Sequence, residues 1–151
     1  MRGRLTLLAA VLFLGSCHQE APRKQARPLT ELETRLAKFI IMHRGPDPVN
    51  TAIILARAKR PRLMTAIACV ETRFGPGACG KAGEVSMFQV LRWPGGNPRD
   101  TGWALKVAEQ HLEEKIKDAK GNLWNGVQRY NGRGREARLY RERVRVLMGE
   151  I

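Results

Sequence analysis

Apolar residues recur along most of this 151-residue chain at the three- and four-residue spacing of amphipathic helices. Turns that contain glycine or proline separate the segments with this pattern. Thr30 and Glu33 form a capping box at the start of the first segment, and Gly45-Pro46 marks its end. The predicted helices begin at Thr30, Asp47, Pro61 and Asp100, and two further helices are predicted at 123–130 and 134–148.

Signals for β-strands are weak along the whole chain, and residues 86–91 are the only candidate for a short extended piece. Residues 74–86 are rich in glycine and other small residues, which predicts a loop. Trp103 is expected on the inner face of the helix that begins at Asp100. The pattern therefore predicts one mainly α domain of about 120 residues, which is long enough to bury a hydrophobic core.

The first residues follow a different pattern. Arg2 and Arg4 precede an apolar run that is too short for a permanent membrane span, and Leu14-Gly15-Ser16-Cys17 follows. This layout is typical of a secretory signal peptide, and its end looks like a lipobox with Cys17 as the lipidated residue. An ordinary signal peptide with an incidental cysteine is the alternative. We expect a signal peptide at 1–16, a lipid-anchored flexible tether at 17–28 and a folded domain at 29–151.

The chain is strongly basic, with 27 Lys and Arg against 14 Asp and Glu. Without residues 1–16, whose only charges are Arg2 and Arg4, the formal net charge falls from +13 to +11. Such an excess favours a negatively charged partner. The signal sequence argues against nucleic acid and favours anionic cell wall or lipid. We interpret the arginines of the 134–148 helix as a solvated face that is suited to such a surface.

Two cysteines remain once Cys17 is assigned to the lipid. An exported protein enters an oxidising compartment, so Cys69 and Cys79 are expected to form a disulfide, with two free thiols as the alternative. Neither cysteine has metal-ligand spacing to any of the three histidines. We therefore expect no metal and no cofactor.

One acidic residue stands out on the helix that begins at Pro61. Glu71 shares a helical face with Met64, Ile67 and Ala68 and lies near the helix C-terminus. Burial and the negative end of the helix dipole both raise the pKa of a carboxyl group, and a carboxyl that stays protonated near neutral pH suits a general acid. The alternative is a glutamate that points to solvent or pairs with Arg73.

Three segments resemble the soluble-lytic-transglycosylase-like domains. The segment AIACVETRF at 66–74 resembles their catalytic helix, which ends in Glu-Ser; GEVSMFQV at 83–90 resembles their glycine-initiated cleft motif; and QRYNGRG at 128–134 resembles their Tyr-Asn-Gly motif. The segments occur in the family's order. Thr72 replaces the usual serine, and Met87-Phe88 replaces Leu-Met.

The resemblance implies a lysozyme-like, mainly α fold and a peptidoglycan lyase. Such an enzyme cleaves the bond between N-acetylmuramic acid and N-acetylglucosamine and leaves 1,6-anhydromuramic ends. Glu71 matches the catalytic acid. The matching positions expected to bind substrate are Ser86, Met87, Phe88, Gln89, Tyr130 and Asn131. Core packing is an equal alternative for Met87 and Phe88, and Asn131 is also suited to the turn after its helix.

Two other functions stay open alongside the lyase. One is a lysozyme-type hydrolase on the same fold, for which Glu84 would be the second acid. The other is a wall-binding lipoprotein without activity. We expect a monomer at the periplasmic face of a membrane. The outer membrane is favoured because His18, and not aspartate, follows Cys17.

Overall fold

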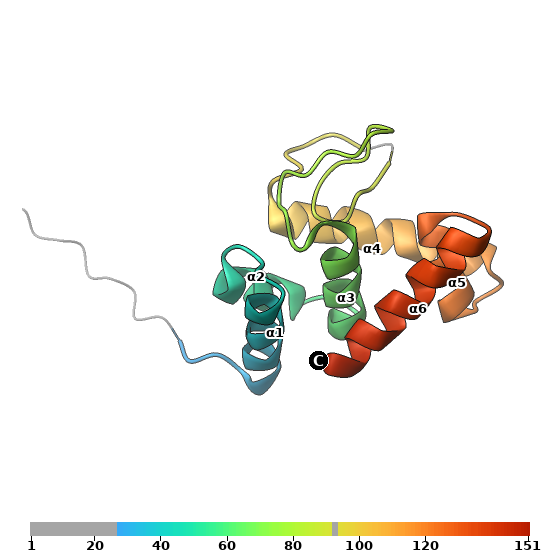
Figure 1. Ribbon diagram of the computed structural model, residues 1–151. Helices are drawn as coiled ribbons and strands as arrows, with labels where there is room; N and C mark the ends of the chain where they lie inside the picture. Colours follow the sequence, from blue (N-terminus) through green and yellow to red (C-terminus); the bar gives the residue numbers. More distant parts are fainter. Residues whose placement is uncertain (1–26, 92–93) are drawn as a thin grey trace, which may run out of the picture.

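The computed structural model describes residues 27–91 and 94–151. Figure 1 shows a helical domain with one long loop region above the central helix. The helices are α1 (Glu31–Met42), α2 (Pro48–Leu55), α3 (Pro61–Thr72), α4 (Thr101–Asp118), α5 (Leu123–Asn131) and α6 (Arg135–Glu150). The predicted mainly α class is confirmed, and every predicted helix is present with bounds close to the expected ones.

Several predictions concern residues outside the described ranges. These are the signal peptide at 1–16, the lipidated Cys17 and most of the tether at 17–28. The last tether residues are described, and Arg27 is bound to α1, where its guanidinium donates to the Glu33 carboxylate at 2.8 Å. Within residues 27–91 and 94–151, none of the helices has the length and apolar content needed to cross a membrane.

The predicted helix starts are partly confirmed by hydrogen bonds. The capping box is formed: the Glu33 amide donates to Thr30 Oγ1, and the Thr30 amide donates to the Glu33 carboxylate. Asp100 accepts from the Trp103 amide at 2.8 Å. Asp47, however, makes no side-chain cap, because its backbone is left-handed (φ 44°), whereas a capping residue needs an extended backbone.

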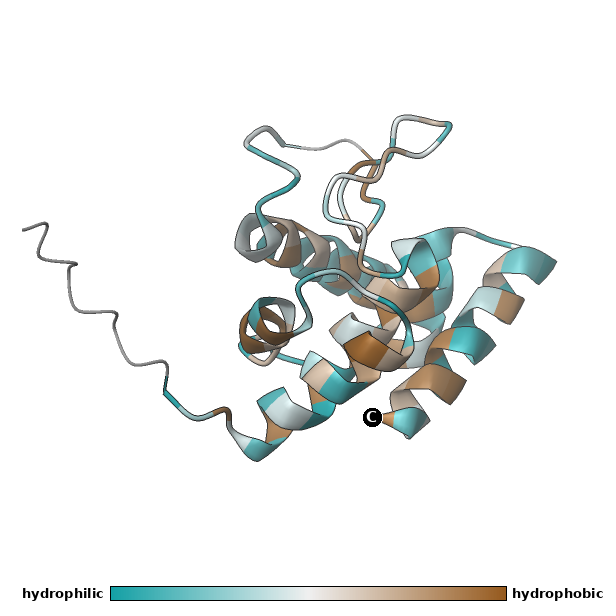
Figure 2. Ribbon diagram, turned by 60° about the vertical axis from the view of Figure 1, so that its left-hand side comes forward, coloured by the Kyte–Doolittle hydropathy of each residue, from teal (hydrophilic) through white to brown (hydrophobic). Residues whose placement is uncertain are grey.

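Helix α3 is the centre of the core. Its residues from Leu63 to Cys69 are all buried, and α3 packs against α1, α2 and α6. Figure 1 shows α3 between the α1–α2 pair and α6. Figure 2 shows hydrophobic residues concentrated in the helices around α3, while α6 carries both hydrophobic and hydrophilic residues. Because other helices surround α3, Glu71 near its C-terminal end lies in a largely apolar environment.

The loop after α3 folds back over the end of this helix. The Thr72 hydroxyl donates to the Met87 carbonyl at 3.0 Å and ties the loop to α3. Val85 and Val90 exchange two backbone hydrogen bonds, of 3.2 and 3.0 Å. Residues 86–91 were expected to be extended, but they form a tight turn closed by this pair, with isolated bridges instead of a strand.

The prediction for Trp103 was wrong. Its side chain is 36% exposed, its indole N–H donates to the Gly95 carbonyl at 2.9 Å, and the Lys106 ammonium lies 5.2 Å from its ring. The buried face of α4 is formed by residues such as Ala104, Ala108 and Leu112. The Trp103 side chain leaves α4 about 100° away from that of Ala104 and lies against the loop at Gly95 and Gly96.

The predicted disulfide is not formed. Cys69 and Cys79 are free thiols, the first buried and the second exposed. Cys69 precedes Glu71 by two residues, so the two side chains leave α3 roughly 200° apart. The Cys69 thiol therefore lies away from the loop of Cys79; Arg73 and Glu150 are its charged neighbours, and burial raises its pKa to about 11.

The contact between α4 and α5 requires a glycine, which gives a testable prediction. A Cβ at Gly126 would meet Ile116 Cγ1 at 2.5 Å and Ile116 Cα at 2.8 Å. Gly126→Ala is therefore expected to lower the free energy of unfolding by about 1–3 kcal/mol, as overpacking does in well-packed cores. Urea unfolding followed by circular dichroism measures it. Gly149→Ala is the control, because a Cβ there meets nothing within 4 Å. Equal stability of both variants would contradict this packing.

Candidate active site

A hollow of about 270 Å³ opens at the C-terminal end of α3, and Glu71 forms part of its wall. Three parts of the chain complete the wall: the loop after α3, helix α4 and the end of α5. The lining residues are Glu71, Gly80, Lys81, Glu84, Gln89, Leu91, His111, Tyr130 and Asn131. The structure therefore brings together Glu71, Gln89, Tyr130 and Asn131, which come from three separate sequence motifs.

The environment of Glu71 favours its protonated form. Burial raises the pKa of the carboxyl from 4.5 to about 7, the negative charge of Glu84 adds to the rise, and a hydrogen-bonding interaction with the Tyr140 hydroxyl opposes it. Because the folded-state pKa is raised, the contribution of Glu71 to stability is fully present below about pH 4.5. It is lost as the pH rises through about 7. Near neutral pH this carboxyl can both donate and accept a proton.

Tyr140 on α6 is a site residue that the sequence did not predict. Its hydroxyl is the one buried side-chain polar atom in the described ranges without a hydrogen bond of good geometry. It nevertheless lies close enough to the Glu71 carboxyl to lower its pKa. Ala137, Tyr140 and Val144 form the buried stripe of α6. The three- and four-residue spacing of these residues indicates a buried face of α6, but the many arginines between them favoured the interpretation of a solvated helix.

Tyr130 stands beside Glu71 in a fixed position. Its side chain is buried, and its hydroxyl donates to the Phe88 carbonyl at 2.9 Å. Burial and the nearby Glu71 raise the pKa of the phenol well above its usual value. The His111 ring packs edge-on against the Tyr130 ring with centroids 4.9 Å apart. Tyr130 therefore stays neutral, and it connects the loop and α4 at the wall of the hollow.

Gln89 is held in the loop by its amide group. Nε2 donates to the Ala78 carbonyl at 3.2 Å and to the Ser86 carbonyl at 2.9 Å. A Cβ at position 80 would lie 2.1 Å from Glu84 Oε2 and 2.7 Å from Gln89 Oε1, so a larger residue there would displace the ends of these two side chains. The absence of a side chain at Gly80 thus allows Glu84 and Gln89 to face the same hollow as Glu71.

Three of the expected substrate-binding residues have a structural role instead. Ser86, Met87 and Phe88 are at most 1% exposed, so a ligand in the hollow cannot reach their side chains. The Ser86 hydroxyl accepts from the Phe88 amide at 3.3 Å and stabilises the turn. Met87 and Phe88 belong to the hydrophobic core. The tight turn between Val85 and Val90 directs these side chains into the core and leaves Gln89 at the hollow.

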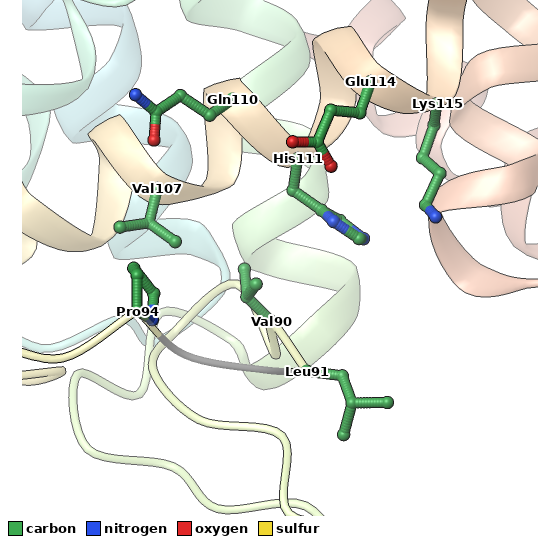
Figure 3. Close-up of a pocket in the computed structure, with 8 residues that line it drawn as sticks. All are labelled: Val90, Leu91, Pro94, Val107, Gln110, His111, Glu114 and Lys115. Atoms are coloured by element: carbon green, nitrogen blue, oxygen red, sulfur yellow. The ribbon is translucent and has the colours of Figure 1, made fainter. Parts of the chain in front are cut away.

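His111 on α4 is a wall residue that the sequence did not indicate. Burial lowers the pKa of its imidazole, and the Lys115 ammonium lowers it further. His111 and Leu91 also line a neighbouring groove of about 480 Å³ between α4 and the loop (Figure 3). In Figure 3 the His111 side chain leaves α4 on the side where Val90 and Leu91 lie. The hollow at Glu71 therefore continues along α4.

Two tryptophans lie away from this site. Neither Trp103 nor Trp124 lines the hollow at Glu71. Trp124 packs against the core, and the Arg145 guanidinium lies 4.4 Å from its ring centroid. Within residues 27–91 and 94–151, no three His, Cys, Asp or Glu side chains converge in a way that could hold a metal ion. The Glu71 carboxyl, with a pKa of about 7, is suited to giving and taking a proton near neutral pH.

Comparisons of the chain with family models, with curated proteins and with solved structures gave no match.

Proposed function

We propose that this protein is a peptidoglycan lytic transglycosylase with Glu71 as its catalytic acid and base. The observation that carries the proposal is a largely buried carboxyl with a pKa of about 7, placed in one hollow with Gln89, Tyr130 and Asn131. These residues belong to the three segments that resemble the soluble-lytic-transglycosylase-like domains. The same resemblance is the basis for proposing a lysozyme-like arrangement of the helices.

The proposed reaction needs only one acid that acts twice. Protonated Glu71 gives its proton to the glycosidic oxygen as the bond to C1 of N-acetylmuramic acid breaks. The resulting carboxylate then takes the proton from the 6-hydroxyl of the same sugar, and this oxygen bonds to C1 to close the 1,6-anhydro ring. No water is added, and Glu71 returns to its protonated form. A pKa near 7 suits both steps, because the group must give and regain a proton at working pH.

A lysozyme-type hydrolase is the second candidate, and the position of Glu84 favours it. This carboxylate lines the same hollow and raises the pKa of Glu71 by its charge. Two carboxyl groups at one site permit a mechanism in which the second activates a water molecule or attacks the sugar. Glu84 is, however, held in its own loop, where it accepts from the Ala82 amide at 3.0 Å. This bond favours a positioning role and hence the lyase.

The proposed setting is the cell envelope. We propose that the protein is a monomeric lipoprotein at the periplasmic face of a membrane, with the outer membrane favoured and glycan strands as its partner. The formal net charge of +11 without residues 1–16 supports attraction to an anionic envelope component.

Product analysis tests the proposed function. Purified peptidoglycan is digested with the wild type, and the soluble fragments are analysed by mass. Fragments with 1,6-anhydromuramic ends are expected, and they are lighter than reducing-end fragments by one water. Reducing ends would establish the hydrolase instead. Absence of any fragment would leave only the non-catalytic wall-binding function.

Two substitutions should move the pH dependence in opposite directions. Tyr140→Phe removes an interaction that favours the Glu71 carboxylate, so the fall of kcat/KM at high pH should move upward by about 0.5–1 pH unit. Glu84→Gln removes a negative charge that favours the protonated form, so the fall should move downward. The pH profile of strand cleavage measures both shifts. Unchanged profiles would mean that neither residue acts on the catalytic acid.

A further inference from the structure

A basic hollow of about 220 Å³ lies between the end of α4 and the turn after α5. It is lined by Lys115, Asp118, Arg129, Gly132 and Arg133. Three cations thus face it with one carboxylate. The surrounding segment is also basic, because residues 115–145 hold ten Lys and Arg against three Asp and Glu.

The cations of the basic hollow are available to a ligand. Arg129 donates to the backbone carbonyl of Asp118 at 2.6 Å, which fixes the guanidinium without neutralising it. Among the described residues, neither Lys115 nor Arg133 takes part in an ion pair or a side-chain hydrogen bond. Gly132 has a φ of 133°, a backbone conformation that suits glycine, and places Arg133 on a turn beyond α5. A fixed guanidinium and two unpaired cations favour an anion, since guanidinium groups bind carboxylates in two-point geometry.

The groove along α4 lies between the candidate active site and the basic hollow. The groove along α4 shares Leu91 and His111 with the hollow at Glu71, and it shares Lys115 with the basic hollow. Figure 3 shows His111, Glu114 and Lys115 following one another along α4 at this groove. Lys115 lies one helical turn, about 6 Å, beyond His111 and is close enough to lower its pKa. A substrate bound at Glu71 can therefore extend to these cations.

We propose that the basic hollow binds a carboxylate of the acidic peptide that hangs from the glycan strand while the glycosidic bond lies at Glu71. The inference rests on the proposed function and adds to it a preference for strands that carry charged peptides. Asp118 would exclude an anion from one side of the hollow, so Lys115, Arg129 and Arg133 make the contact. Loss of the peptide carboxylates should weaken substrate binding and leave proton transfer at Glu71 unchanged.

The test compares two substrates and two variants of the whole protein. Glycan strands freed of phosphate-containing polymer are used as they are, or after their peptide carboxylates have been converted to amides with carbodiimide and ammonia. Arg133→Gln removes one cation of the basic hollow. Arg57→Gln is the control, because Arg57 is also exposed, carries the same charge and lies after α2, away from the basic hollow. Cleavage is followed as kcat and KM, and co-sedimentation with strands gives Kd independently of activity.

On amidated strands the KM and Kd of the wild type should rise about five- to tenfold with little change in kcat, as expected when a charge-assisted contact is lost. Arg133→Gln should show the same rise in KM and Kd on native strands, and amidation of the strands should raise them no further. Arg57→Gln should behave as the wild type. Equal binding of native and amidated strands by the wild type would overturn the inference, as would equal effects of both substitutions. A protein that binds strands with this preference but does not cut them would refute the proposed function and retain the basic hollow.

Discussion

Replacing Glu71 by glutamine is expected to abolish strand cleavage, with a loss of at least about 10³-fold in kcat. General acid–base catalysis contributes about 10²–10⁴-fold, and here one group supplies both the acid and the base. Glutamine has nearly the same shape as the protonated carboxyl but cannot give up a proton. The measurement is the rate of release of soluble fragments from purified glycan strands at pH 6.

Glu84→Gln is the matched control for this experiment. It makes the same change of carboxyl to amide in the same hollow, but the lyase mechanism does not use Glu84 for proton transfer. We therefore expect it to retain activity within about tenfold at its own optimal pH, since its charge acts only on the pKa of Glu71. A loss in Glu84→Gln equal to that in Glu71→Gln would indicate the two-carboxylate hydrolase. Full activity of Glu71→Gln would remove Glu71 from the mechanism.

Phe88→Ala is expected to lower the free energy of unfolding by about 3–5 kcal/mol, the usual loss for a buried aromatic side chain. Phe88 is fully buried, and its backbone carbonyl accepts the hydrogen bond of the Tyr130 hydroxyl. A cavity beneath the turn should also loosen the position of Gln89 and Tyr130. Urea unfolding followed by circular dichroism measures the stability.

Leu91→Ala is the control for Phe88→Ala, because Leu91 belongs to the same loop but its side chain is 47% exposed. Its free energy of unfolding should change by less than about 1 kcal/mol. If Phe88→Ala were as stable as Leu91→Ala, the Phe88 side chain would not be in the core. The first interpretation of Phe88, as a substrate-binding residue, would then regain its place.

The sequence predicted the helices well because their apolar spacing and their caps are local features. Thr30 with Glu33, and Asp100 before Trp103, form the bonds that their spacing indicated. Glu71 was also predictable, since the face it shares with Met64 and Ile67 is buried in the core.

The errors arose where tertiary packing decides which way a side chain points. Ser86 and Phe88 lie in a motif expected at the cleft, yet the Val85–Val90 turn directs both into the core. Tyr140 faces Glu71 from an arginine-rich helix that had no apparent connection to the site. Such contacts depend on how α6 packs on α3, and local periodicity does not encode that packing.

The ionisation of Glu71 itself is the most direct test of the central claim. Carbon-13 NMR follows the side-chain carboxyl signals of the wild type from pH 3 to pH 9, and the signal absent from Glu71→Gln identifies Glu71. We expect a titration midpoint near pH 7, well above the ordinary 4.5 of a glutamate. A midpoint at 4.5 would mean that the carboxylate is already ionised at working pH and has no proton to donate, which would contradict its role as the catalytic acid.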